Sequence, residues 1–157
     1  MRPFAVLGVI ALSFALGSIT LGHGLLVPLI DDAELVDPNL ARTLATPLIE
    51  RSSECLLAAT IILAMISRRW VARRFAGPLA LSIAGLAAMD RFIVLPRLGQ
   101  AWSRVDRVAL RPVEQLESAL RLESIHEWCL VTALLLLLIL IGLITWRSDS
   151  RSAPNPV

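Results

Sequence analysis

Residues 125–146 read IHEWCLVTALLLLLILIGLITW, an apolar run with tryptophan at positions 128 and 146. An α-helix between these tryptophans rises about 27 Å, close to the ~30 Å thickness of the hydrocarbon core of a bilayer. Tryptophan side chains gather at the two membrane interfaces. The stretch therefore predicts a helix that crosses a membrane from one interface to the other.

The composition of the chain also favours a membrane protein. Of its 157 residues, 56% are hydrophobic and the mean hydropathy is +0.71, whereas an ordinary soluble domain is roughly 45 to 50% apolar. The 15 basic residues are all arginine, and the formal net charge is +2. Because these arginines form no single stripe or tail, a nucleic-acid partner is not expected. We expect one small domain whose main partner is the lipid bilayer.

Apolar segments of about 20 residues predict four crossings. The expected fold class is all-α: an integral membrane four-helix bundle over residues 1–147, followed by a disordered cytoplasmic tail at 148–157. The spans are expected at about 4–30, 48–67, 76–95 and 125–146.

Prolines and caps set the expected ends of these spans. The second span is expected to begin at Pro47 with Thr46 as its N-cap, because a proline at the first helical position loses no hydrogen bond. The third is expected to close before Pro96. Apolar residues recur at helical spacing from Pro112 onward, so the fourth helix is expected to begin there and to extend beyond the membrane on the outer side.

The first span has no formal charge over residues 4–30. It is longer than the apolar core of a signal peptide, which has about 7 to 15 residues. Although Arg2, Ala15 and Gly17 are also compatible with a cleaved signal, we expect this segment to be retained.

The arginines indicate how the chain is oriented. The connection SRRWVARR at residues 67–74, with Arg2, Arg147 and Arg151, sets seven basic residues against Asp149 on one side, a net charge of +6. The rest of the chain carries −4. Since Lys and Arg gather in cytoplasmic loops, both termini are expected in the cytoplasm and the protein in a bacterial inner (plasma) membrane.

Polar residues of the apolar segments fall mainly in the outer half or at the outer interface. Ionisable groups in lipid are costly and normally turn toward one another inside a bundle. The pattern predicts an outer-facing polar chamber. Its expected members are His23, Glu50, Arg51, Glu54, Cys55, Asp90, Arg91, Glu123, His126, Glu127 and Cys129.

Asp90 is expected to form a structural ion pair. Its neighbour Arg91 points about 100° away around the helix, so the partner must lie elsewhere. Arg51 on the second span is the leading candidate, and Arg97, seven residues further along the same face, is the local alternative. A proton or substrate site at Asp90 is the second interpretation.

Two histidines raise the possibility of haem. His23 lies between Gly22 and Gly24, which permit close approach of a helix or ligand, and His126 lies near the outer interface. If the first and fourth helices are neighbours, the two imidazoles can face each other as axial ligands of haem b. Hydrogen-bonded structural histidines and a proton-handling role are the alternatives.

A metal site is a further hypothesis. His126 and Cys129 are three residues apart on one helical face, Glu123 lies one turn earlier, and Cys55 is placed to approach from the second span. A thiolate, an imidazole and a carboxylate would suit copper or zinc. A disulfide between Cys55 and Cys129, or two inert thiols, would explain the same cysteines.

Signatures of conventional catalysis are missing from the sequence. It has no nucleotide-binding glycine loop, nucleophile elbow, HExxH pair or CxxCH motif. The ExxH of Glu123 and His126 occurs once, whereas a di-iron bundle needs two such motifs. An enzymatic role is therefore not favoured.

Several segments together carry a family resemblance. The first span ends in GHGLLVPLI (22–30), an outer loop leads to LATPLIE (44–50), the third span ends in VLPRLGQAW (94–102), and a histidine precedes the final leucine-rich run. The chain resembles the small four-helix bacterial membrane proteins of unknown function related to the animal cisplatin-resistance-associated transmembrane protein. The likeness covers roughly residues 5–146. Matching positions include Gly17, Pro28, Pro96 and His126.

The opening of the fourth span departs from that family. Its members usually have a leucine-histidine-glycine step and a serine three residues after the histidine. Here Ile125, Glu127 and Cys129 surround His126 instead. The resemblance implies a four-helix integral membrane domain, more distantly similar to copper-resistance and haem-associated membrane proteins, and it implies no established reaction.

Three functions follow as hypotheses. The first is a polytopic membrane protein whose outer chamber binds a small ligand or supports an assembly. The second is a haem- or copper-binding redox protein. The third is an accessory subunit of a homo-oligomer or larger membrane complex that docks through small residues of the first and third spans. Those residues are Gly8, Ala15, Ala80, Ala84 and Ala88.

Overall fold

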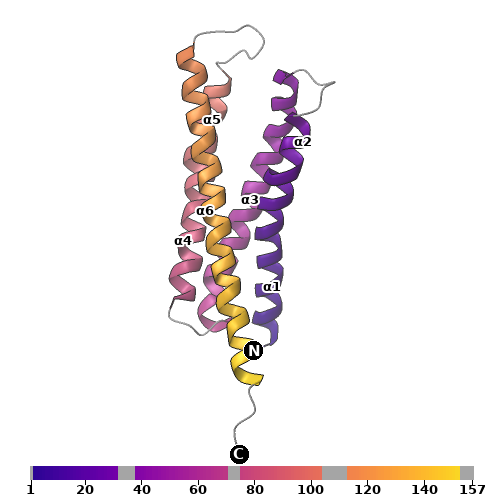
Figure 1. The fold of residues 1–157 in the computed structure, drawn as a ribbon, viewed down its shortest axis with the longest axis vertical. Helices are drawn as coiled ribbons and strands as arrows, with labels where there is room; N and C mark the ends of the chain where they lie inside the picture. The colour runs from indigo at the N-terminus through magenta and orange to yellow at the C-terminus, as the bar shows by residue number, and fades with distance from the viewer. Residues whose placement is uncertain (1, 32–37, 71–74, 104–112, 153–157) are drawn as a thin grey trace, which may run out of the picture.

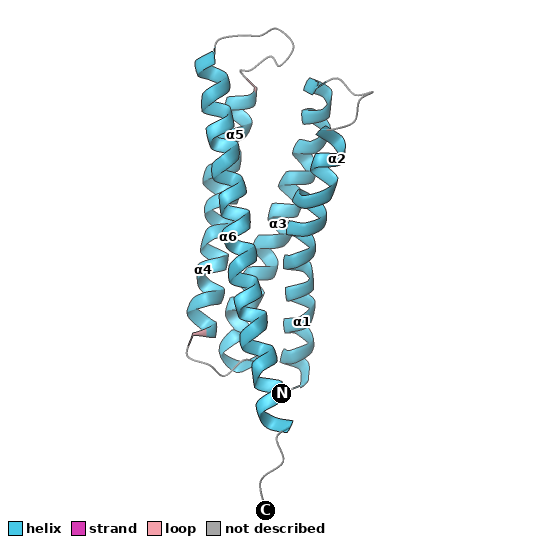
Figure 2. Cartoon of the chain, viewed as in Figure 1, coloured by secondary structure: helices cyan, strands magenta, loops and turns pink. Residues whose placement is uncertain are grey.

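A computed structural model describes residues 2–31, 38–70, 75–103 and 113–152, and apart from a turn residue at Phe75 and at Ser103 these are helical (Figure 2). The prediction of an all-α chain with four long helices is confirmed. We call the four the first to fourth rods, in chain order. Their elements are α1 (Arg2–Gly17), η1 (Ser18–Leu26) and α2 (Val27–Asp31); α3 (Pro38–Trp70); α4 (Ala76–Met89), η2 (Asp90–Val94) and α5 (Leu95–Trp102); and α6 (Val113–Ser152).

Three of the rods are long and apolar enough to cross a membrane. These stretches are Pro3–Ile30, Ala76–Trp102 and Leu116–Thr145, with mean hydropathies of 2.2, 1.6 and 2.8. The second rod does not meet the same criterion. Its longest stretch without a charged residue runs from Cys55 to Ser67, which is about 20 Å of helix.

Some expected boundaries were wrong. The second rod begins at Pro38, so Pro47 lies inside the helix rather than at its start. The third rod continues through Pro96 to Trp102. The fourth begins at Val113, close to the expected Pro112, and continues to Ser152, so residues 148–152 are helical. Residues 71–74, with Arg73 and Arg74 of the basic connection, and 153–157 of the expected tail lie outside the described part.

Two π-helical segments explain how prolines are accommodated inside the first and third rods. A proline inside an α-helix has no N–H to donate, and its ring clashes with the carbonyl four residues earlier. Pro28 and Pro96 each follow a π-segment after one intervening residue. That residue donates its N–H to a carbonyl five residues back, Val27 to Gly22 and Leu95 to Asp90. The wider turn keeps both rods continuous through their prolines.

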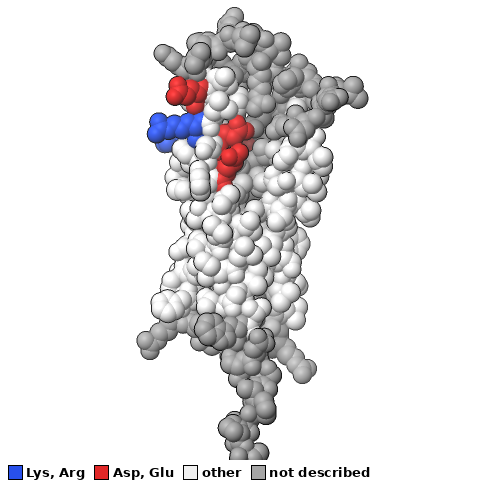
Figure 3. All heavy atoms as spheres, in the orientation of Figure 1, with Lys and Arg blue, Asp and Glu red and all other residues white. Residues whose placement is uncertain are grey.

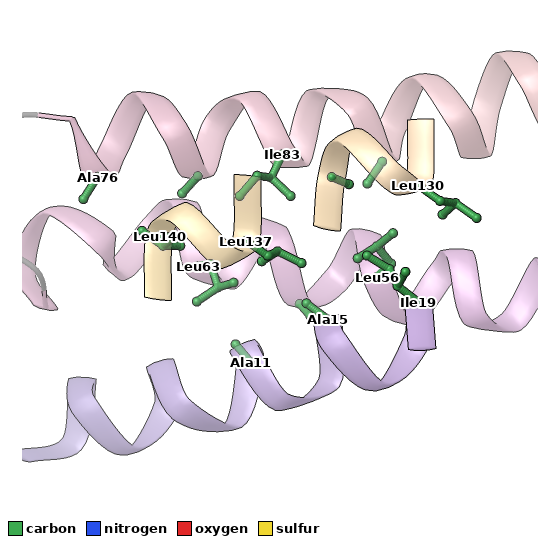
Figure 4. Packing of buried hydrophobic residues seen from close by; sticks show 14 residues of the cluster. Ala11, Ala15, Ile19, Leu56, Leu63, Ala76, Ile83, Leu130, Leu137 and Leu140 are labelled. Carbon is green, nitrogen blue, oxygen red and sulfur yellow. The ribbon is translucent and has the colours of Figure 1, made fainter. Parts of the chain in front are cut away.

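The rods pack around an apolar core in the half of the molecule where α1 begins and α6 ends (Figures 1 and 4). Every rod contributes buried side chains that point into a shared interior. Small residues on the first and third rods let the helix axes approach. The residues labelled in Figure 4 are Ala11, Ala15, Ile19, Leu56, Leu63, Ala76, Ile83, Leu130, Leu137 and Leu140.

A second, smaller apolar cluster occupies the opposite half, where α2 and α5 lie (Figure 1). Its buried members are Ala45, Ile49, Leu95, Leu98, Trp102 and Ala119. On each rod a short interval separates residues of this outer cluster from residues of the main core. The polar side chains described below occupy those intervals.

The small residues expected to form a docking surface are mostly not available for one. Gly8, Ala15 and Ala80 are buried within the chain, and Ala84 and Ala88 are half-buried. Their small side chains serve the packing of the rods against one another. The accessory-subunit hypothesis therefore loses the surface on which it was based.

The close approach of the first and second rods at Gly22 predicts a stability effect. A Cβ added to Gly22 would lie 2.7 Å from the Cβ of Ser52, so Gly22→Ala must push the first and second rods apart. We expect a loss of about 1 to 3 kcal/mol, as for other overpacked cores. Unfolding of the purified protein in detergent by heat or denaturant measures it.

Gly85→Ala is the matched control, because a Cβ there has no neighbour within 4 Å. We expect its stability to equal or exceed that of the wild type, since alanine is the better helix former. Equal stability of the two variants would contradict the close contact at Gly22.

Candidate functional site

Four polar side chains, one from each rod, form a continuous layer across the interior. Asp90 begins η2, His126 lies on α6, His23 lies in η1 and Ser52 lies on α3. Asp90 contacts His126, His126 contacts His23, and His23 contacts Ser52. We call this set the polar layer. It lies between the main core and the outer apolar cluster.

The buried end of the layer is the pair of Asp90 and His126. Nδ1 of His126 lies 2.6 Å from Oδ1 of Asp90, and the two residues are 6% and 1% exposed. A carboxylate accepts hydrogen bonds and cannot donate them, so this contact orients Nδ1–H of His126 toward Asp90. The other ring nitrogen, Nε2, is then left for another contact. Oδ2 of Asp90 is buried and has no hydrogen-bond partner in the described structure.

The other end of the layer is held by Ser52. Its Oγ donates to the carbonyl of Ile49 at 3.0 Å and lies 2.9 Å from Nε2 of His23. Because the single hydroxyl proton is used on Ile49, Ser52 accepts the Nε2–H of His23. The absence of a side chain at Gly22 brings η1 close enough to α3 for this bond.

The two imidazoles are in direct contact. The ring centroids of His23 and His126 are 5.1 Å apart and the ring planes cross at 65°, an edge-to-face arrangement. The first and fourth rods are therefore neighbours at this level, as the haem hypothesis required.

A pocket of about 650 Å³ opens beside the histidines, between the first and fourth rods. Its size lies in the range of small-molecule sites, roughly 300 to 1,000 Å³. Most of its wall is apolar, and the polar side chains converge at the histidines and two carboxylates. The lining residues are Ile19, Thr20, His23, Gly24, Val27, Pro28, Ile49, Leu98, Glu123, His126, Glu127, Leu130, Val131 and Leu134.

A second polar group ties α3 to η2. Glu54 accepts hydrogen bonds from Arg51 at 2.8 Å and from Arg91 at 2.9 Å. In Figure 3 the red and blue charged side chains lie near one end of the face that is drawn, and the white surface beyond them is uncharged. Three of the polar residues expected to lie near one another, Arg51, Glu54 and Arg91, are therefore in contact.

The expected partner of Asp90 was wrong. Arg51 is 81% exposed at its side chain and bonds to Glu54, one turn along its own helix. Arg97 is also exposed. Asp90 instead faces the interior and pairs with His126, because a side chain at that position on the third rod points toward the fourth rod.

The histidine geometry does not fit bis-histidine haem. Metal to imidazole-nitrogen distances are about 2.0 to 2.1 Å, and axial ligands on opposite faces of a haem have the macrocycle between their rings. The edge-to-face contact of His23 and His126 leaves no such space.

The expected metal set of Glu123, His126, Cys129 and Cys55 is not assembled. In the described ranges no group of three or more His, Cys, Asp or Glu residues is placed to hold a metal ion. Cys129 is buried, whereas Cys55 is exposed and lines a groove between α1 and α3. The two thiols are free, so they do not form the alternative disulfide.

Comparison with protein-family models, with curated proteins and with solved structures finds no match to this chain. The resemblance carried by residues 5–146 therefore stays a prediction. The candidate site rests on its own geometry.

Sequence reasoning missed Ser52 and the bond between Asp90 and His126. Ser52 gave no signal, because a serine between Arg51 and Glu54 looks like part of a solvated turn. The pairing of Asp90 had a usable signal: Asp90 and His126 are both ionisable residues set in apolar segments and placed at similar depth.

The buried pair predicts strong energetic coupling. Replacing His126 with leucine would leave Asp90 buried without a partner, which costs about 3 to 5 kcal/mol of folding stability. Asp90→Leu with His126→Leu removes both polar groups, so we expect the double variant to be more stable than the sum of the single losses implies. Denaturant unfolding of all four proteins in detergent measures the coupling.

Glu54→Leu with Arg91→Leu is the control cycle at a half-exposed ion pair. It should give a coupling below about 1 kcal/mol. Strictly additive losses at Asp90 and His126 would contradict the contact.

Proposed function

We propose that this chain is an integral membrane four-helix bundle with both termini in the cytoplasm, and that it binds a small amphipathic molecule in the pocket between its first and fourth rods. The pocket would then face the outer half of the membrane. The observation that carries the proposal is a largely apolar pocket of about 650 Å³ in which two histidines from different rods meet.

The crossing of all four rods is supported by where the charges lie. Three rods have the length and hydropathy of membrane spans. The second rod carries charged residues on both sides of its apolar stretch: Arg68 and Arg69 follow it, and Glu54, which precedes it, is paired with Arg51 and Arg91. Pairing reduces the cost of such groups near lipid. The adjoining apolar stretch from Cys55 to Ser67 lies beside apolar parts of the other rods in the main core.

Hydrogen-bonding atoms of the polar layer that have no partner in the described structure favour a role in ligand binding over a purely structural one. A locked polar network would use both nitrogens of each imidazole and both oxygens of Asp90. Here one nitrogen of His126 makes no hydrogen bond within the described structure, and His126 lines the pocket. Apolar walls with a few convergent polar groups are typical of small-molecule sites.

The redox and subunit hypotheses gain no comparable support. The histidines contact each other edge to face, and the potential metal ligands stand apart. The small residues that suggested a lateral interface are largely used inside the chain. Ligand binding in the outer pocket is thus the function that the arrangement favours.

Filling the pocket should abolish ligand retention. Val131 lines the pocket and is 46% exposed, so Val131→Trp places a bulky ring in it with little disturbance to the core. We expect native mass spectrometry of the wild type, released from its own membranes, to show a bound small amphiphile that this variant lacks. Leu138→Trp, at an exposed position that does not line the pocket, should retain it.

A wild type that carries no such molecule, or two tryptophan variants that retain it equally, would contradict the proposed binding site.

The proposed orientation is tested by single cysteines in a Cys55→Ala, Cys129→Ala background. Gln100→Cys lies near the end of the third rod, and a cysteine in place of Val157 marks the C-terminus. We expect a membrane-impermeant maleimide added to intact cells without an outer-membrane barrier to label position 100 only. Labelling of position 157 under these conditions would reverse the orientation.

A further inference from the structure

We infer that the pocket selects an ammonium-bearing amphiphile over neutral and anionic molecules of the same shape. This inference rests on the proposed function and names its ligand class. It follows from three features of the pocket wall: the order of residues along α6, the hydrogen-bonding state of His126, and the backbone before Pro28.

The pocket wall on α6 changes character along the helix. Glu123 and Glu127 come first, His126 lies beside them, and Leu130, Val131 and Leu134 follow toward the main core. Among the residues that the structure describes, those that line the pocket include no arginine. A bound amphiphile would therefore place its polar head beside the carboxylates and its apolar body beside the leucines. The charge of the wall favours a cationic head over an anionic one.

His126 supplies an acceptor inside this pocket. Asp90 holds the proton of the ring on Nδ1. In the neutral imidazole the remaining nitrogen, Nε2, accepts hydrogen bonds and cannot donate. His126 is 6% exposed, so a ligand that offers no donor would leave this nitrogen without a partner in an apolar surrounding. An ammonium group supplies both the donor and the positive charge.

The first rod adds to the excess of acceptors. Pro28 and Gly24 both line the pocket. Because proline has no N–H, the turn that contains Gly24 has one carbonyl more than it has donors. Such carbonyls at interrupted membrane helices are suited to bind cations. The segment of the first rod that lines the pocket therefore has spare acceptor capacity in its backbone.

Three rigid probes of nearly equal shape test this selectivity: 1-aminoadamantane, 1-adamantanol and adamantane-1-carboxylate. The protein is reconstituted in nanodiscs of uncharged lipid, and binding is measured by equilibrium dialysis of radiolabelled probe against empty nanodiscs at pH 7. We expect the amine, which is an ammonium ion at this pH, to bind about tenfold more tightly than the alcohol. The carboxylate should bind most weakly.

Variants identify the groups that select the charge. Glu123→Gln with Glu127→Gln should weaken binding of the amine about tenfold and leave the alcohol within about twofold. Glu117→Gln, on an exposed position of α6 outside the pocket, is the matched control and should change neither. The wild-type order of affinities must reappear in this control.

The outcomes separate this inference from the proposed function. If the alcohol or the carboxylate binds as tightly as the amine and Val131→Trp abolishes that binding, the pocket is a ligand site but the ammonium selectivity is wrong. Tightest binding of the carboxylate would mean that Nε2 of His126 donates, which also overturns the inference. If none of the three probes binds, both the pocket function and its selectivity are overturned.

Discussion

A carboxyl group in the interior of an apolar helical protein is tolerated only if something replaces the water it has lost. Within the part of the chain that the structure describes, Asp90 meets this constraint through a short bond to Nδ1 of His126. The bond fixes the face that the third rod turns toward the fourth, and it fixes the plane of the His126 ring. The ring in turn contacts His23 and forms part of the pocket wall. The position of the candidate site therefore depends on this one pair.

The backbone around the pair is adapted to it. Asp90 opens one π-helical segment and His23 lies within the other, and each segment precedes a proline. Irregular turns in membrane helices are tolerated where they are buried in protein or line a cavity. π-helical turns are also frequent at functional sites. The same local geometry thus accommodates Pro28 and Pro96 and presents a buried ionisable side chain to a neighbouring rod.

More of the fold than of the candidate site could be predicted from the sequence. Long runs of apolar residues at 4–30 and 125–146 favour long helices over other structures, and the structure has helices there. Helix ends were harder, because Pro47 and Pro96 look like breakers in sequence and are absorbed inside continuous helices. Periodicity describes which residues share a face. It does not indicate where a helix widens into a π-helical turn that accommodates a proline.

The candidate site could be predicted only in part, because residue types alone do not show which side chains are in contact. The sequence predicted that His23 and His126 would face each other only if the first and fourth helices were neighbours, and the structure places the two rings in contact. The partner of Asp90 was assigned to an arginine, since opposite formal charge is the only attraction that sequence displays directly. His126 lies on the face of α6 that is turned toward the third rod, so its ring reaches Asp90. Arg51 is exposed and pairs instead with Glu54, one turn away on its own helix.

The central claim is that Asp90 holds the proton of His126 on Nδ1. Solid-state NMR of protein in lipid, with 15N-labelled histidine and 13C-labelled aspartate, tests it directly, and His23→Gln assigns the His126 signals. We expect Nδ1 of His126 to be protonated and to show direct magnetisation transfer to the carboxyl carbon of Asp90, a transfer that is lost in Asp90→Asn. An unprotonated Nδ1 with no transfer to Asp90 would contradict it.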